Sequence, residues 1–120
     1  NLLYGNTKKV SNEEILSLIN SYNLFNETKI DLEMNITNKS LSSGQMQKIS
    51  FIRALLSKPE ILILDESTSN LDYDSKLLIN KELENLDLTI INATHYITDV
   101  AYDNHLHIEV KDNLRIIRKL

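Results

Sequence analysis

An uninterrupted apolar run, Ile61 to Leu64, is the sequence feature that most restricts how this chain folds. It is short and ends at two acids, Asp65 and Glu66. A run of this kind is typical of a strand buried on both faces, as in parallel sheets. A second strand is predicted over 89–93, and leucine spacing between the two strands predicts a helix over roughly 73–86. We therefore expect an α/β fold containing a right-handed βαβ crossover.

Two further helices are predicted before the first strand. Ser11 and Glu14 form a capping-box pattern ahead of apolar residues at helical spacing, which predicts a helix over 12–23. Ser42 and Gln45 repeat the pattern ahead of a longer amphipathic helix of about four turns. Both helices need an apolar surface to pack against, so they are expected to join one core with the strands.

The remaining segments carry weaker patterns. Apolar residues alternate within 24–40, which allows either a short strand or an extended connector. The C-terminal part, 104–110 and 114–118, predicts a β-hairpin, because Asp112 and Asn113 suit the tight turn between the two strands.

Composition limits the classes of function. The 120 residues, 42% of them apolar, fit one domain with a modest core. A net charge of −4 without a basic tract argues against a nucleic-acid partner. With no cysteine there is no disulfide partner and no thiolate metal site. The sequence lacks the roughly 20 apolar residues of a membrane-spanning helix. It begins with Asn1 rather than Met, so we expect a piece cut from a longer protein.

The residues suited to chemistry gather at predicted element ends. Ligands of open parallel sheets bind at the carboxyl ends of the strands, which is where Asp65, Glu66 and His95 fall. The helix that starts after Ser42 offers free amides to an anion. Together these parts suit a nucleotide with magnesium, and we expect ATP. With only two glycines, however, the chain cannot contain the G-x-x-x-x-G-K-[ST] phosphate loop.

Each of these features also has a structural explanation when it is taken alone. Acids often end strands simply to meet solvent, and a Ser-x-x-Gln sequence is more often only a helix cap. A single histidine such as His95 is more often an ordinary surface or core residue. The order of the features along the chain favours the functional interpretation.

In that order, residues 41–95 resemble the second half of an ATP-binding cassette (ABC) ATPase domain. Leu41 to Gln45 resembles the signature sequence, Ile61 to Asp65 the Walker B strand, Glu66 the catalytic glutamate, Ser69 to Asp72 the D-loop, and His95 the switch histidine. Asn1 to Asn6 resembles the segment after the Q-loop of exporters. Ser43 departs from the pattern, because the family usually has a second glycine there.

The resemblance implies a partial P-loop NTPase fold: a parallel sheet core, a helical subdomain and a C-terminal β-hairpin. Residues 1–58 would form the helical subdomain, and 59–120 the C-terminal part of the RecA-like core. The implied site residues are Asp65 for magnesium, Glu66 and His95 for catalysis, and Ser42, Ser43, Gly44, Gln45 and Asp72 for contact with the ATP of a second domain.

The resemblance also implies an ATP hydrolase whose domains dimerise head to tail. They would work with a transmembrane transporter domain at the cytoplasmic face of the cell membrane, most simply for export. We expect the 120 residues alone to show no saturable ATP hydrolysis, because the phosphate loop lies outside them. Two alternatives stay open: an ABC-type ATPase of DNA repair or chromosome maintenance, and a non-catalytic module that keeps the fold for dimerisation.

Overall fold

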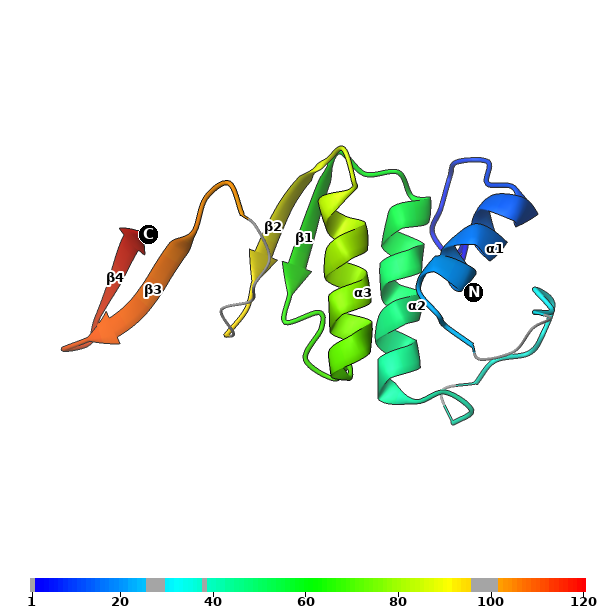
Figure 1. Cartoon of the computed structure of the whole chain (residues 1–120), viewed down its shortest axis with the longest axis horizontal. Coiled ribbons are helices and arrows are strands. Elements are labelled where there is room, and N and C mark those ends of the chain that lie inside the picture. Colours follow the sequence, from blue (N-terminus) through cyan, green and yellow to red (C-terminus); the bar gives the residue numbers. More distant parts are fainter. Residues whose placement is uncertain (1, 26–29, 38, 96–101) are drawn as a thin grey trace.

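The computed structural model describes residues 2–25, 30–37, 39–95 and 102–120. The elements in chain order are α1 (Asn12–Ser21), α2 (Ser43–Leu56), β1 (Ile61–Asp65), α3 (Tyr73–Glu84), β2 (Thr89–Ala93), β3 (Leu106–Lys111) and β4 (Leu114–Lys119), as Figure 1 shows. The three predicted helices, the two parallel strands and the hairpin are confirmed.

β1 and β2 form a parallel pair joined by α3. Ile61 lies opposite Thr89 at one end of the pair, and Asp65 lies opposite Ala93 at the other. The carboxyl ends of both strands and the N-termini of α2 and α3 face the same, lower end of the molecule in Figure 1. The predicted site residues are therefore gathered at that end.

The core lies between the helices and one face of this sheet. Leu62 and Leu64 are buried and belong to a cluster that also holds Ile52, Leu56 and Ile79, whose side chains are fully buried. Burying aliphatic side chains of this size contributes about 1.5–3 kcal/mol each. The cluster fixes the spacing between the sheet and helices α2 and α3.

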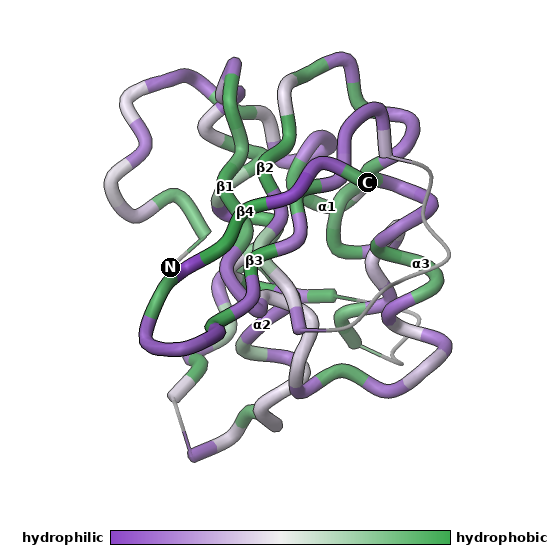
Figure 2. The backbone as a smooth tube through the Cα atoms, turned by 90° about the vertical axis from the view of Figure 1, so that its left-hand side faces the viewer, coloured by the Kyte–Doolittle hydropathy of each residue, from purple (hydrophilic) through white to green (hydrophobic). Residues whose placement is uncertain are grey.

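The expectation that β1 is buried on both faces is wrong for this chain. Ile61 and Ile63 are 57% and 71% exposed, and Ile91 on β2 is 55% exposed. The reason is that the core helices cover only the face that carries Leu62 and Leu64. Figure 2 shows the apolar character of both strands in green.

Side-chain caps start all three helices. Ser11 Oγ accepts from the Glu14 amide (3.2 Å) at α1. At α2 the predicted capping box is complete: the Gln45 amide donates to Ser42 Oγ (3.1 Å), and the Ser42 amide donates to Gln45 Oε1 (2.9 Å). Each cap satisfies first-turn amides that have no partner within the helix.

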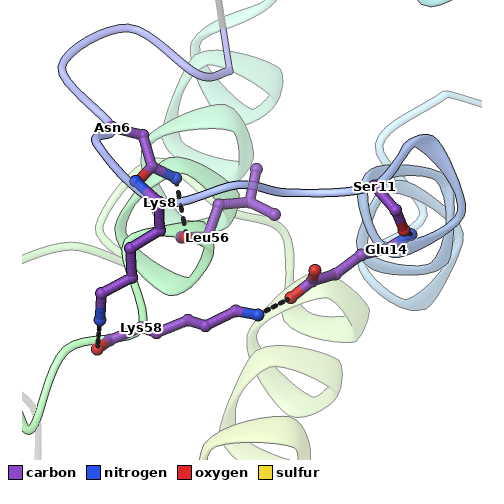
Figure 3. Close-up of polar contacts among 6 residues, drawn as sticks. All are labelled: Asn6, Lys8, Ser11, Glu14, Leu56 and Lys58. Carbon is purple, nitrogen blue, oxygen red and sulfur yellow. Dashed lines mark hydrogen bonds and ion pairs between the residues drawn. The ribbon is translucent and has the colours of Figure 1, made fainter.

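The N-terminal segment is tied to the C-terminal end of α2 (Figure 3). Asn6 Nδ2 donates to the Leu56 carbonyl (2.8 Å), and Lys8 Nζ donates to the Lys58 carbonyl (2.9 Å). Lys58 Nζ in turn pairs with Glu14 Oε1 of α1 at 2.9 Å. Donors and cations are favoured here because the last carbonyls of a helix lack intrahelical partners.

Among the two options for 24–40, the described residues favour the connector, since none of them belongs to a strand. Ile30 and Leu32 instead pack against the core by single side chains. The β3–β4 hairpin turns at Asp112 and Asn113, with φ of 51° and 62°, which is the backbone a tight two-residue hairpin loop requires.

The hairpin stands apart from the core at one end of the long axis (Figure 1), and most of its apolar side chains are exposed. Within the described residues, no helix combines the length and the apolar character needed to cross a bilayer.

Candidate functional site

The closest contact between predicted site residues joins the ends of β1 and β2. Glu66 Oε1 lies 2.8 Å from His95 Nε2, and the side chains are 51% and 83% exposed. The contact follows from the sheet: the strands are parallel and in register, so the residues just beyond Asp65 and Ala93 meet at one edge. The expected proximity of Glu66 and His95 is confirmed.

Glu66 has an unusual backbone for a residue with a side chain. Its φ is 46°, in the left-handed region that L-residues enter at a cost of about 1–2 kcal/mol. Two hydrogen bonds hold it there: its amide donates to the Ala93 carbonyl (2.9 Å), and its carbonyl accepts from the Ser69 amide (3.0 Å). Conformations of this kind persist where the surroundings over-determine them, often at functional sites.

Asp65 lies on the uncovered face of the sheet. The alternation along β1 puts its side chain on the same face as Ile61 and Ile63, away from the helices. Its carboxylate has no hydrogen bond or ion pair within the described part of the chain. The described residues also hold no group of three or more His, Asp or Glu side chains able to bind a metal ion by themselves.

The first turn of α2 offers backbone donors. Ser42 is the N-cap, and its hydroxyl is occupied by the Gln45 amide. Gln45 Nε2 also donates to the Leu24 carbonyl (3.4 Å), so this side chain holds the turn in place. The amides of Ser43 and Gly44 belong to the first turn, where intrahelical acceptors are lacking, and are therefore suited to an anion.

The loop of residues 66–72, hereafter the 66–72 loop, packs beside this turn. A Cβ placed on Gly44 would lie 3.5 Å from the Asn70 carbonyl oxygen and 3.6 Å from Leu71 Cδ2. Leu71 is buried and anchors the loop in the core. The last residue of the loop, Asp72, is the N-cap of α3.

Both carboxylate oxygens of Asp72 are already engaged within this chain. Oδ1 accepts from the Ser75 amide (2.8 Å) and Oδ2 from the Ser75 hydroxyl (2.9 Å). The backbone hydrogen bond from Ser75 is the main cause that lowers the pKa of Asp72, with the Ser75 hydroxyl second and a smaller contribution from the Lys48 ammonium. The observed contacts of Asp72 are those of a helix cap.

Gln47, which the sequence did not single out, contacts the 66–72 loop. Its Oε1 accepts from the Asn70 amide (3.2 Å), and its Nε2 donates to Ser69 Oγ (3.3 Å). It lies one helical turn beyond Ser43, on the same face of α2. Only that spacing could have suggested the contact from sequence, since no motif marks the residue.

Apart from Asp72, the predicted site residues form two groups. Glu66 and His95 meet at the sheet edge, with Asp65 at the end of β1 beside them. Residues 42–45 lie against 70–71 at the start of α2. No hydrogen bond or ion pair between described residues joins the two groups directly.

A cavity of about 670 Å³ lies elsewhere, between α1, α2 and 30–36. Ile19, Ile49 and Arg53 are among its lining residues, and none of the predicted site residues lines it. It therefore has no part in the chemistry considered for the sheet edge.

Comparison with known proteins gives the class of this chain. The family model described as ABC transporter matches residues 3–69, which is more than half of the chain. The chain belongs to the ABC transporter family, as the motifs predict.

Three relatives illustrate the match. The chain is 36% identical to an ATP-dependent lipid A-core flippase of Francisella tularensis subsp. tularensis over 98% of this chain and 20% of the relative. It is 40% identical to the lactococcin-A transport/processing ATP-binding protein of Lactococcus lactis subsp. lactis over 98% of this chain and 17% of the relative. It is 51% identical to the mating factor M secretion protein of Schizosaccharomyces pombe over 48% of this chain. The chain spans about a fifth of the length of the first two.

Proposed function

We propose that this chain supplies the acids, the histidine and the signature turn of an ATP-hydrolysing domain that powers transport across a membrane, in the direction of export. The observation that carries the proposal is the 2.8 Å contact between Glu66 and His95 at the carboxyl ends of two parallel strands. Support also comes from relatives whose names describe flipping of a lipid, transport and secretion.

A carboxylate and two backbone amides of this chain suit a nucleotide with magnesium. Magnesium prefers one or two carboxylates together with phosphate oxygens and water, and the unengaged carboxylate of Asp65 at the end of β1 suits that role. Bound there, the ion would supply charge neutralisation for the phosphate oxygens. The free amides of Ser43 and Gly44, with Ser42 and Gln45 shaping the turn, suit a terminal phosphate.

Glu66 and His95 have different roles at the sheet edge. The Glu66 carboxylate accepts a proton from the attacking water, while the imidazole of His95 fixes the carboxylate through Nε2. A positioning role suits phosphoryl transfer, where alignment and electrostatics supply most of the rate.

The site requires partners. Residues 1–58 act as a helical subdomain and 59–120 as part of the RecA-like core, and the missing phosphate loop comes from another segment. Because residues 42–45 have no hydrogen bond to Glu66, we assign them to the ATP held by a second domain in a head-to-tail dimer. Asp72 lies at the same dimer interface, and a transmembrane domain places the assembly at the cytoplasmic face of the membrane.

The test is Glu66→Gln in the full-length protein that contains this chain. Loss of a general base lowers the rate by about 10²–10⁴-fold. We therefore expect hydrolysis to fall by about that factor while ATP binding persists and ATP-bound dimers accumulate, as measured by phosphate release and by light scattering.

Glu60→Gln is the matched control, because it makes the same change at the opposite, exposed end of β1 and should leave hydrolysis unchanged. Unaltered hydrolysis in Glu66→Gln would overturn the proposal and favour a non-catalytic dimerisation module.

A further inference from the structure

Among the described residues, the side chain of Gln47 makes the only hydrogen bonds between helix α2 and the 66–72 loop. One amide group makes both contacts, accepting from the backbone of Asn70 at 3.2 Å and donating to the Ser69 hydroxyl at 3.3 Å. The primary amide carries an acceptor and a donor side by side, so it matches the pair of groups that the loop presents.

The anchored residues sit in the middle of a tightly turned loop. The Ser69 amide donates to the Glu66 carbonyl (3.0 Å), and the Leu71 amide donates to the Thr68 carbonyl (3.2 Å). A shift at Ser69 is therefore passed to Glu66 through one hydrogen bond. Glu66 responds directly, because its left-handed backbone depends on that same turn.

The structure assigns Gln47 as a positioning residue for hydrolysis: it holds the 66–72 loop on the first turn of α2 and so fixes where the Glu66 carboxylate points. The inference rests on the proposed function, in which Glu66 accepts a proton. Gln47 also connects the first turn of α2, proposed to bind phosphate, to Glu66 of the same chain. No hydrogen bond between described residues joins these two groups directly.

Gln47→Met keeps the length and helix preference of the side chain and removes both hydrogen bonds. In the full-length protein we expect kcat to fall about three- to tenfold, the range for losing one to two ordinary hydrogen bonds, and KM for ATP to stay within about twofold. Gln47→Glu should restore kcat to within about twofold, because the Asn70 amide and the Ser69 hydroxyl can both donate to a carboxylate.

Amide exchange in the 120-residue chain supplies a readout that is independent of ATP. The Asn70 amide should exchange about three- to tenfold faster in Gln47→Met than in the wild type or Gln47→Glu. Ser50→Ala is the control on the same helix, since the exposed Ser50 hydroxyl bonds only the Met46 carbonyl. It should change neither exchange at Asn70 nor kcat.

Two results would overturn the inference: a wild-type kcat in Gln47→Met, or equal losses in Gln47→Met and Gln47→Glu. Either result alongside an active wild type and an inactive Glu66→Gln would leave the proposed function standing. An inactive wild type would instead count against the proposed function, and Asn70 exchange would still decide whether Gln47 anchors the loop.

Discussion

At the scale of single residues, a glycine at position 44 is needed for the proposed site but not for the fold. It lies in the first turn of α2, and its backbone is not in the left-handed region that would demand glycine. A Cβ there would make ordinary van der Waals contacts with the 66–72 loop. In the proposed function, the absence of a side chain would allow a phosphate to come close to the first-turn amides.

Gly44→Ala should accordingly fold and lose function. We expect the free energy of unfolding to be unchanged or raised by up to about 1 kcal/mol, because alanine favours the helix. ATP hydrolysis of the full-length protein should fall, since the new methyl group occupies the approach to the amides. Chemical unfolding and phosphate release measure the two effects. Full hydrolysis in a stable Gly44→Ala variant would remove the phosphate role from this turn.

The sequence predicted Glu66 and His95 together because parallel strands end at the same sheet edge, a rule that needs no coordinates. It could not predict the left-handed backbone of Glu66 or the anchor at Gln47. The Glu66 backbone depends on hydrogen bonds to Ala93 and Ser69, and the Gln47 anchor depends on the 66–72 loop lying beside α2. No local sequence pattern encodes either contact.

At the scale of elements, the helix starts could be predicted from the sequence because polar capping residues mark them. The capping patterns at Ser11 and Ser42 start α1 and α2 as predicted. The alternation within 24–40 left its structure open, because Ile30 and Leu32 fill gaps in the core singly without a neighbouring strand to pair with. Asp72 caps α3 through its hydrogen bond with the Ser75 amide.

The cap at Asp72 gives the chain a pH-dependent stability. Its folded pKa lies below the ordinary value because hydrogen bonds from Ser75 favour the charged carboxylate. A lowered pKa means that this stabilisation is present above the unfolded pKa and is lost as pH falls through the folded one, below about pH 4.

Asp72→Asn keeps a capping oxygen but does not titrate. The difference in unfolding free energy between wild type and Asp72→Asn should therefore shrink as pH is lowered from 7 to 3, in urea unfolding of the 120-residue chain. A difference that stays constant with pH would contradict this account of the cap.

At the scale of the whole molecule, the uncovered face of β1 and β2 is where sequence and structure diverge. The apolar run at Ile61 to Leu64 correctly predicted a strand, but burial of both faces requires covering elements that the described residues do not supply. Asp65 shares this face with Ile61 and Ile63.

The central claim is that Glu66 and His95 act as one hydrolytic unit. Their exposed pair contributes at most about 1 kcal/mol to stability, so substitutions there should leave the fold intact. Residues that work on one step give non-additive losses, whereas independent residues give losses that multiply.

The most direct measurement is therefore the ATP hydrolysis rate of the full-length protein as wild type, Glu66→Gln, His95→Ala and the double variant. We predict that each single change lowers kcat by about 10²-fold or more, and that the double variant is no more than about twofold slower than Glu66→Gln. Losses that multiply in the double variant, or a wild-type rate in His95→Ala, would contradict the account.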